Sequence, residues 1–126
     1  MVAARTNVIL VMMNSPNPSF HQLSQQQLAV LRAVLAPFAD KIELVGIFGS
    51  RATGMARPNS DIDLVLYGDV EAAVVDRLRT LFSESLLAIT VDLQAYQAIT
   101  YPALKQHIDA VMQPLFTQQE LLASRG

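Results

Sequence analysis

The sequence predicts a single domain of the α/β (α+β) class, in which a small mixed β-sheet is flanked by helices. The first observation is length, since 126 residues are enough for one domain. The second is composition, because 52% of the residues are apolar and can fill a core. The third is the order of the elements, in which segments with apolar residues at helical spacing alternate with short runs rich in β-branched residues.

A helix and two strands are expected in the first half of the domain. Ser24 and Gln27 have the spacing of a capping box, and leucines follow them at helical intervals until a proline intervenes. Lys41–Phe48 and Asp61–Tyr67 are predicted to be strands, because both are short and rich in β-branched or aromatic residues. Residues 49–60, between these strands, contain glycine, proline and asparagine and are expected to form a loop.

The second half is expected to add two longer helices, a third strand and a short last helix. Val70–Phe82 has an apolar stripe with charged residues outside it, which predicts a helix. Leu87–Leu93 is predicted to be the third strand. Pro102–Gln113 is predicted to be a helix, because proline is favoured at a helix start and apolar residues follow at helical spacing. Thr117 and Glu120 have the spacing that caps a short helix.

Residues 1–20 are predicted to be an N-terminal arm, and residues 21–126 the domain. The apolar run Val8–Met13 is too short to span a bilayer, so no membrane is expected. The chain has no cysteine, which excludes disulfides and thiolate metal sites and fits a cytoplasmic location. The formal net charge is −2 without any run of Lys or Arg, so a long nucleic acid is not an expected partner.

Asp61 and Asp63 are the first indication of chemistry. In a strand their side chains project from one face, while Ile62 and Leu64 point into the core. Two neighbouring carboxylates repel each other unless a cation lies between them, and Mg²⁺ is commonly held by one or two carboxylates plus substrate phosphates. Asp92 lies in the predicted third strand and completes a three-carboxylate site if that strand lies beside the second.

A second group of candidate residues precedes the carboxylates. Gly49 at the end of a strand allows the backbone to approach a phosphate, and the hydroxyl of Ser50 can donate to it. Arg51 and Arg57 could neutralise phosphate charge. Each feature has an ordinary structural interpretation when taken alone, whereas the combination is hard to obtain by chance.

The combination of Gly49 and Ser50, ten intervening residues, and Asp61-x-Asp63 resembles the nucleotidyltransferase superfamily related to DNA polymerase β, in its minimal single-domain branch. Ser60 belongs to the Ser-Asp-Ile-Asp-Leu form that is typical of this branch. The resemblance covers the chain from the predicted helix at residue 24 to the third strand. It implies a minimal polymerase β-like nucleotidyltransferase fold.

The resemblance also implies roles for residues. Asp61, Asp63 and Asp92 are expected to hold two Mg²⁺ ions and to be catalytic, and Asp92 could accept the proton of the attacking hydroxyl. Nucleotide binding, with ATP as the nucleoside triphosphate, is expected from Gly49, Ser50, Arg51 and Ser60.

One position departs from the family pattern. The family loop often reads Gly-Ser-Arg-Ala-Arg-Gly, and Thr53 stands here in place of the second arginine. This change either weakens the binding of phosphate or shifts the nucleotide preference, and the sequence leaves the two open.

Many members of this branch look like antitoxins that are encoded beside a HEPN-domain ribonuclease toxin. The resemblance therefore implies AMP transfer to a tyrosine hydroxyl of such a toxin, within a hetero-oligomer. Charged residues make up only 16% of the chain, which fits a surface partly covered by a partner. Two alternatives remain: an antitoxin that neutralises its toxin by binding alone, and a nucleotidyltransferase acting on a small molecule such as an aminoglycoside. Outside this site, His21 and His107 are assigned ordinary core or surface roles.

Overall fold

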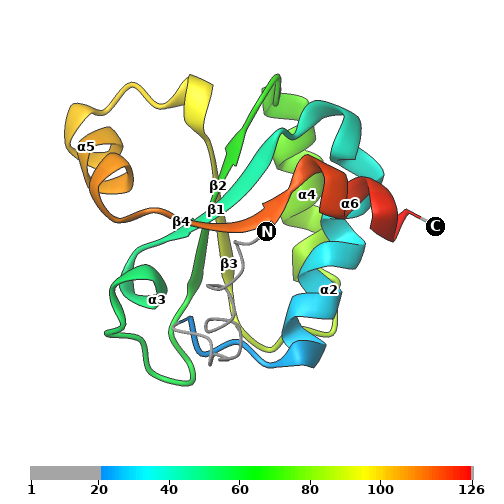
Figure 1. Cartoon of the computed structure of the whole chain (residues 1–126), viewed down its shortest axis with the longest axis horizontal. Coiled ribbons are helices and arrows are strands. Elements are labelled where there is room, and N and C mark those ends of the chain that lie inside the picture. Colours follow the sequence, from blue (N-terminus) through cyan, green and yellow to red (C-terminus); the bar gives the residue numbers. More distant parts are fainter. Residues whose placement is uncertain (1–20, 126) are drawn as a thin grey trace, which may run out of the picture.

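The computed structural model describes residues 21–125, so the predicted arm at residues 1–20 lies outside the described part of the chain. A four-stranded sheet forms its centre, in the order β3-β2-β1-β4 (Figure 1). Strand β1 pairs antiparallel with both β2 and β4, whereas β2 and β3 run parallel. The predicted mixed sheet is therefore confirmed. The strands are β1 (Leu44–Phe48), β2 (Ile62–Tyr67), β3 (Val91–Ala95) and β4 (Gln113–Thr117).

Helices lie on both sides of this sheet. Helices α2, α4 and α6 lie on one side, and α3 and α5 lie on the other (Figure 1). Helix α4 connects β2 with β3, as a parallel pair of strands requires. The helices are α2 (Gln25–Leu35), α3 (Ser50–Thr53), α4 (Ala72–Ser83), α5 (Pro102–Val111) and α6 (Gln118–Ser124), with two short 3₁₀ segments, η1 (Ala36–Lys41) and η2 (Tyr96–Ala98). No helix of the described chain is long and apolar enough to cross a membrane.

Two capping boxes predicted from spacing are present. The Ser24 Oγ accepts a hydrogen bond from the Gln27 N–H at 3.0 Å, and the Gln27 side chain accepts from the Ser24 N–H at 2.9 Å. Thr117 and Glu120 make the same reciprocal pair at the start of α6. A capping box involves only residues three positions apart, which explains why the sequence was sufficient to predict both.

Three element predictions need correction. The third strand begins at Val91 instead of Leu87, because pairing with β2 starts where Val91 lies opposite Ile62. The segment predicted as a loop at residues 49–60 begins with the single-turn helix α3. Strand β4 was not predicted, since it contains Pro114, but its position at the sheet edge tolerates a residue without an N–H.

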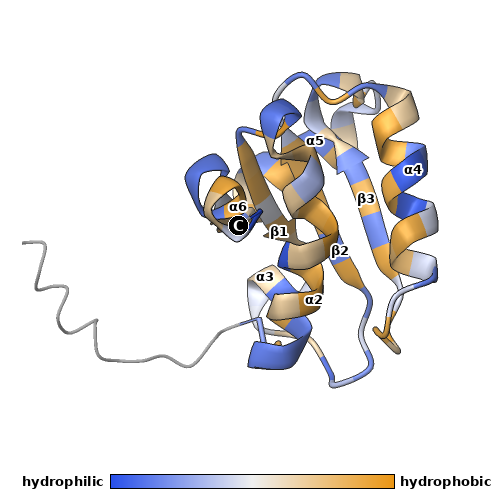
Figure 2. Ribbon diagram, turned by 90° about the vertical axis from the view of Figure 1, so that its right-hand side faces the viewer, coloured by the Kyte–Doolittle hydropathy of each residue, from blue (hydrophilic) through white to orange (hydrophobic). Residues whose placement is uncertain are grey.

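The two faces of the sheet have different roles. Ile62, Leu64 and Leu66 are fully buried in the main core beneath α2, α4 and α6. Along α2 and α4, apolar residues alternate with polar ones, as expected for helices that cover a core (Figure 2). On the opposite face, a smaller cluster joins α5 to the sheet through Ile108, Phe48 and Val65. Because side chains alternate along a strand, Asp63 lies on this second face.

Candidate active site

Asp63 and Asp92 are brought together by the pairing of β2 with β3. The two residues lie directly opposite each other in the parallel register, so their side chains leave the same face of the sheet. Asp61 lies two residues before Asp63, at the entrance to β2, where the N–H of Ile62 donates to the carbonyl of Thr90 at 2.9 Å. Asp61 and Asp92 are exposed, whereas Asp63 is partly buried. The structure therefore assembles the three carboxylates at one end of the β2–β3 pair.

The pKa of Asp63 is raised from 3.8 to about 6. Partial burial is the largest cause, and the negative charges of Asp92 and Asp61 act in the same direction. The positive charges of His107 and Arg51 oppose the shift. The site therefore holds more negative charge than its own cations compensate, which is the condition that favours binding of an additional cation.

This shift predicts that the unfolding free energy of the metal-free protein falls between about pH 4 and pH 6. The folded-state pKa lies above the unfolded value, so in this range the folded protein binds a proton that the unfolded chain does not. Stability is therefore highest when Asp63 is protonated and is lost as the pH rises through about 6. Urea unfolding in EDTA at several pH values measures the slope. Asp63→Asn should have a flatter profile, and an equal slope in both proteins would contradict the assignment.

Gly49 allows the Asp63 carboxylate to pack against the backbone. Its φ of +70° and ψ of −153° lie in a region that is essentially restricted to glycine. A Cβ atom at this position would collide with the Oδ2 of Asp63. Gly49 also turns the chain from β1 into α3, where its carbonyl accepts hydrogen bonds from the N–H groups of Ala52 and Thr53. Ser50, the first residue of α3, is thereby placed beside the carboxylates.

Arg51 has a different role from the predicted contact with phosphate. The side chain is 1% exposed, and its guanidinium donates to backbone carbonyls: that of His21 at 2.8 Å, that of Ser60 at 2.9 Å and that of Pro58 at 3.2 Å. Burial lowers the pKa of Arg51, and the negative charge of Asp63 opposes this shift. Because protein carbonyls surround the guanidinium, the structure assigns Arg51 to holding the loop before Asp61 and not to binding phosphate. Sequence reasoning had no means of foreseeing burial of an arginine.

Replacing Arg51 is expected to destabilise the protein strongly. Arg51→Met should lower the unfolding free energy by about 3 kcal/mol or more, because several buried carbonyls would lose a charged donor. The unfolding free energy of Arg51→Lys should lie between those of Arg51→Met and the unmodified protein, since one ammonium group cannot reproduce the planar set of donors. Arg57→Met is the matched control: that side chain is exposed, and a change within about 0.5 kcal/mol is expected. Equal midpoints of urea denaturation for Arg51→Met and Arg57→Met would refute the role of Arg51 in holding the loop before Asp61.

The remaining predicted residues shape the loop that leads to the carboxylates. The Ser60 hydroxyl accepts a hydrogen bond from the Arg57 N–H at 2.8 Å, so its role in this structure is to close the turn. The side chain of Arg57 is exposed. Thr53, where the family often has arginine, donates through its hydroxyl to the Ser50 carbonyl at 3.3 Å within α3. Of this group, only Arg57 has a side chain with a free cationic end at the surface of the loop.

His107 lies near the carboxylates, although the sequence analysis gave it no functional role. It extends from α5, and its ring meets that of Phe48 edge-on, with centroids 6.2 Å apart and an interplanar angle of 76°. Phe48 is paired with Asp63 across β1 and β2 and directly precedes Gly49. No spacing rule connects residue 107 with residues 61–63. Only the packing of α5 on the sheet reveals the relation.

The donor set fits Mg²⁺ held together with a nucleotide. In residues 21–125 no group of three or more Asp, Glu or His side chains forms a ready-made metal cage. Mg²⁺ does not need one, because it commonly binds through one or two carboxylates and completes its shell with phosphate oxygens and water. The raised pKa of Asp63 shows two further negative charges acting on a third carboxylate. These residues therefore fit the ion when a triphosphate supplies the other ligands.

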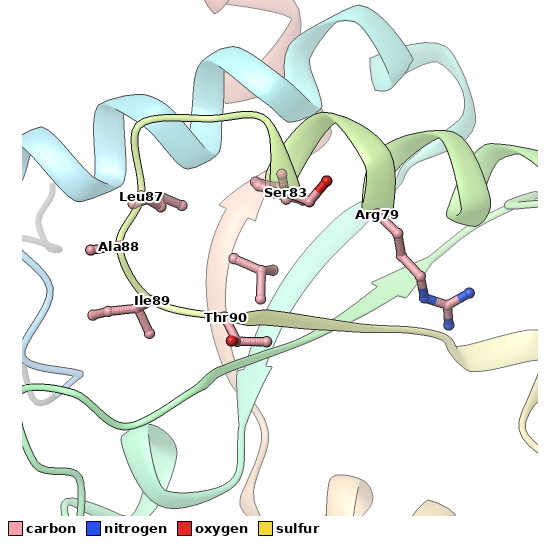
Figure 3. A pocket seen from close by; sticks show the side chains of 8 residues that line it. Arg79, Ser83, Leu87, Ala88, Ile89 and Thr90 are labelled. Atoms are coloured by element: carbon pink, nitrogen blue, oxygen red, sulfur yellow. The ribbon is translucent and has the colours of Figure 1, made fainter.

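A separate pocket of about 230 Å³ lies between the end of α4 and the segment leading into β3. Leu87, Ala88 and Ile89 line it from that segment, and Arg79 reaches it from α4 (Figure 3). None of Asp61, Asp63 and Asp92 lines this pocket. It is therefore distinct from the carboxylate site, because Asp63 and Asp92 lie on the other face of the sheet.

Comparison with known proteins identifies the family. The family model described as polymerase beta, nucleotidyltransferase matches residues 31–121. A solved structure of a toxin–antitoxin with AMP-PNP aligns over 77% of this chain and 79% of its own, with 23% sequence identity and a TM-score of 0.59. The toxin–antitoxin MntA–HepT aligns over 80% of each chain, with 23% identity and a TM-score of 0.55. These two likenesses show the fold. No curated protein matches the chain.

Proposed function

Because the chain belongs to the polymerase β nucleotidyltransferase family and is a nucleotidyltransferase, we propose that it transfers AMP from ATP to a tyrosine hydroxyl of a partner toxin. The observation that carries the chemical part is the pairing of Asp63 with Asp92 beside Asp61, with the Gly49–Ser50 turn adjacent. Through this reaction the protein would act as the antitoxin of a HEPN-domain ribonuclease, in a hetero-oligomer.

The chemistry follows from the positions of these residues. Asp61, Asp63 and Asp92 would hold two Mg²⁺ ions, which stabilise charge on the entering and leaving oxygens. The acceptor hydroxyl oxygen forms a bond to the α-phosphorus, while the bond from that phosphorus to the β-phosphate oxygen breaks and pyrophosphate leaves. Asp92, exposed beside Asp63, takes the hydroxyl proton. Ser50 and the backbone of the Gly49 turn bind the triphosphate.

Three observations favour a protein acceptor and a toxin partner. The similar folds occur in toxin–antitoxin structures, one of them with AMP-PNP. Asp61 and Asp92 are exposed, so an acceptor hydroxyl presented by a second protein can reach them. The low charge content also fits a surface covered by a partner. The requirement for ATP and the absence of cysteine favour action in the cytoplasm.

The test is incubation with α-³²P-labelled ATP and Mg²⁺, with and without the protein encoded next to this one, followed by a denaturing gel. Label on the neighbouring protein, lost on addition of EDTA, is the expected result. Tight binding of the neighbour without label would replace the proposal by an antitoxin that acts through binding alone. Label recovered only on a small hydroxylated compound such as an aminoglycoside would replace the protein acceptor by a small molecule.

A further inference from the structure

Helix α5 covers part of the same sheet face that carries the carboxylates. Ile108 is fully buried against Phe48 and Val65, which fixes the helix over the ends of β1 and β2. His107 precedes Ile108 and is exposed, with its ring edge-on to Phe48. Because Phe48 lies opposite Asp63 and next to Gly49, the imidazole of His107 lies near the end of the β1–β2 pair that carries Asp63.

Few cations of the described chain are available to this site. Arg51 is buried among carbonyls, Arg79 and Arg125 are paired with acidic side chains, and Lys105 lies over the ring of Tyr96. The other cations outside the site lie on the opposite face or at the far end of β1: Arg32, Lys41 and Arg77.

Within residues 21–125, Arg57 in the loop and His107 on α5 are exposed groups near the carboxylates that can carry positive charge. The charge of His107 acts to lower the pKa of Asp63, so the two side chains are close enough to interact. A bound triphosphate together with Asp61, Asp63 and Asp92 carries more negative charge than two Mg²⁺ ions and one loop arginine would neutralise. A solvent-exposed imidazole near Asp63 is suited to donate to phosphate oxygens once the nucleotide and its metal are bound.

We propose that His107 contacts the triphosphate of the bound nucleotide and is a nucleotide-binding residue supplied by α5. This inference rests on the proposed function. It makes α5 a second wall of the nucleotide site, opposite the Gly49–Ser50 turn, and it gives the helix a role beyond covering the small cluster of Phe48, Val65 and Ile108.

The experiment is calorimetric titration of the full chain with AMP-PNP in Mg²⁺, and separately with AMP. His107→Gln should weaken binding of AMP-PNP by about tenfold, the loss expected for one charge-assisted hydrogen bond, and leave the weaker binding of AMP little changed. His107→Arg should retain the binding of AMP-PNP. Gln106→Ala, an exposed change on the same helix, is the matched control and should bind as the unmodified protein does.

The outcomes separate this inference from the proposed function. If the unmodified protein binds AMP-PNP and His107→Gln binds it equally well, the inference is overturned while the function stands. A similar loss for AMP-PNP and AMP also overturns it, because the histidine would then act through packing and not through the terminal phosphates. If the unmodified protein binds neither nucleotide in Mg²⁺, the proposed function itself fails, whatever the variants do. Thermal unfolding of each variant checks that the helix remains in place.

Discussion

Asp63→Asn is expected to abolish nucleotidyl transfer while the protein stays folded. Asp63 is partly buried, and its pKa is raised by this burial and by the charges of Asp92 and Asp61. An amide at this position removes a charged ligand from the metal site, and the rate should fall by about a thousandfold or more. The same change relieves repulsion among the carboxylates, so the metal-free variant should be at least as stable as the unmodified protein at pH 7.

Transfer of label from α-³²P-labelled ATP, together with urea denaturation in EDTA, measures both parts of this expectation. Asp69→Asn is the control, because Asp69 is an exposed acid that follows the other end of β2. It should leave transfer unchanged. The double change of Asp61 and Asp63 to Asn should be as inactive as the single change at Asp63. Transfer that persists in the double variant would refute the assignment of these residues to the metal site. If Asp63→Asn is inactive because it is unfolded, transfer by the double variant and by Asp92→Asn decides the assignment.

Gly49→Ala is expected to have the second largest effect, on both stability and activity. A Cβ atom would meet the Oδ2 of Asp63, and a φ of +70° with a ψ of −153° strains any residue other than glycine. Relief requires the carboxylate or the turn to move, and a displacement of about 1 Å at reacting groups can cost about a hundredfold in rate. The strained backbone should also lower the unfolding free energy by about 1–3 kcal/mol.

Gly54→Ala provides the matched control for this prediction. Gly54 also has a positive φ, +81°, but nothing lies within 4 Å of the Cβ position. Gly54→Ala should lower the unfolding free energy by about 1–2 kcal/mol, because alanine must adopt the left-handed backbone conformation. Its rate of transfer should stay close to that of the unmodified protein. Equal losses of transfer in the two alanine variants would show that backbone strain, and not the contact with Asp63, controls the rate. Steady-state transfer and urea denaturation on both variants decide the point.

Several residues of the candidate site could be proposed from the sequence, because the patterns that indicate them involve residues close together in the chain. The Asp-x-Asp spacing places Asp61 and Asp63 on one face of any strand that contains them, and a glycine after a strand predicts a turn. The family pattern added the Gly-Ser pair ten residues upstream. The capping boxes at Ser24 and Thr117 were predicted for the same reason, since each depends on residues one helical turn apart.

Tertiary structure decided what depends on neighbours distant in the chain. The extent of β3 and the place of Asp92 opposite Asp63 follow from the register between two strands that α4 separates. Strand β4 exists because the edge of β1 is available to pair with it, despite Pro114.

Arg51 and His107 show the same limit for single side chains. The sequence analysis assigned Arg51 to nucleotide binding and gave His107 an ordinary core or surface role, and the packing of the fold changed both assignments. Arg51 is enclosed by carbonyls contributed from residues 21–22 and 57–60, and His107 is carried by α5 to the carboxylates through the burial of Ile108. By itself, then, the sequence determined the family, the order of most elements and the spacing that puts Asp61 and Asp63 on one face. The tertiary structure decided which charged side chains are available to a nucleotide, because burial and strand register depend on contacts that no local pattern records.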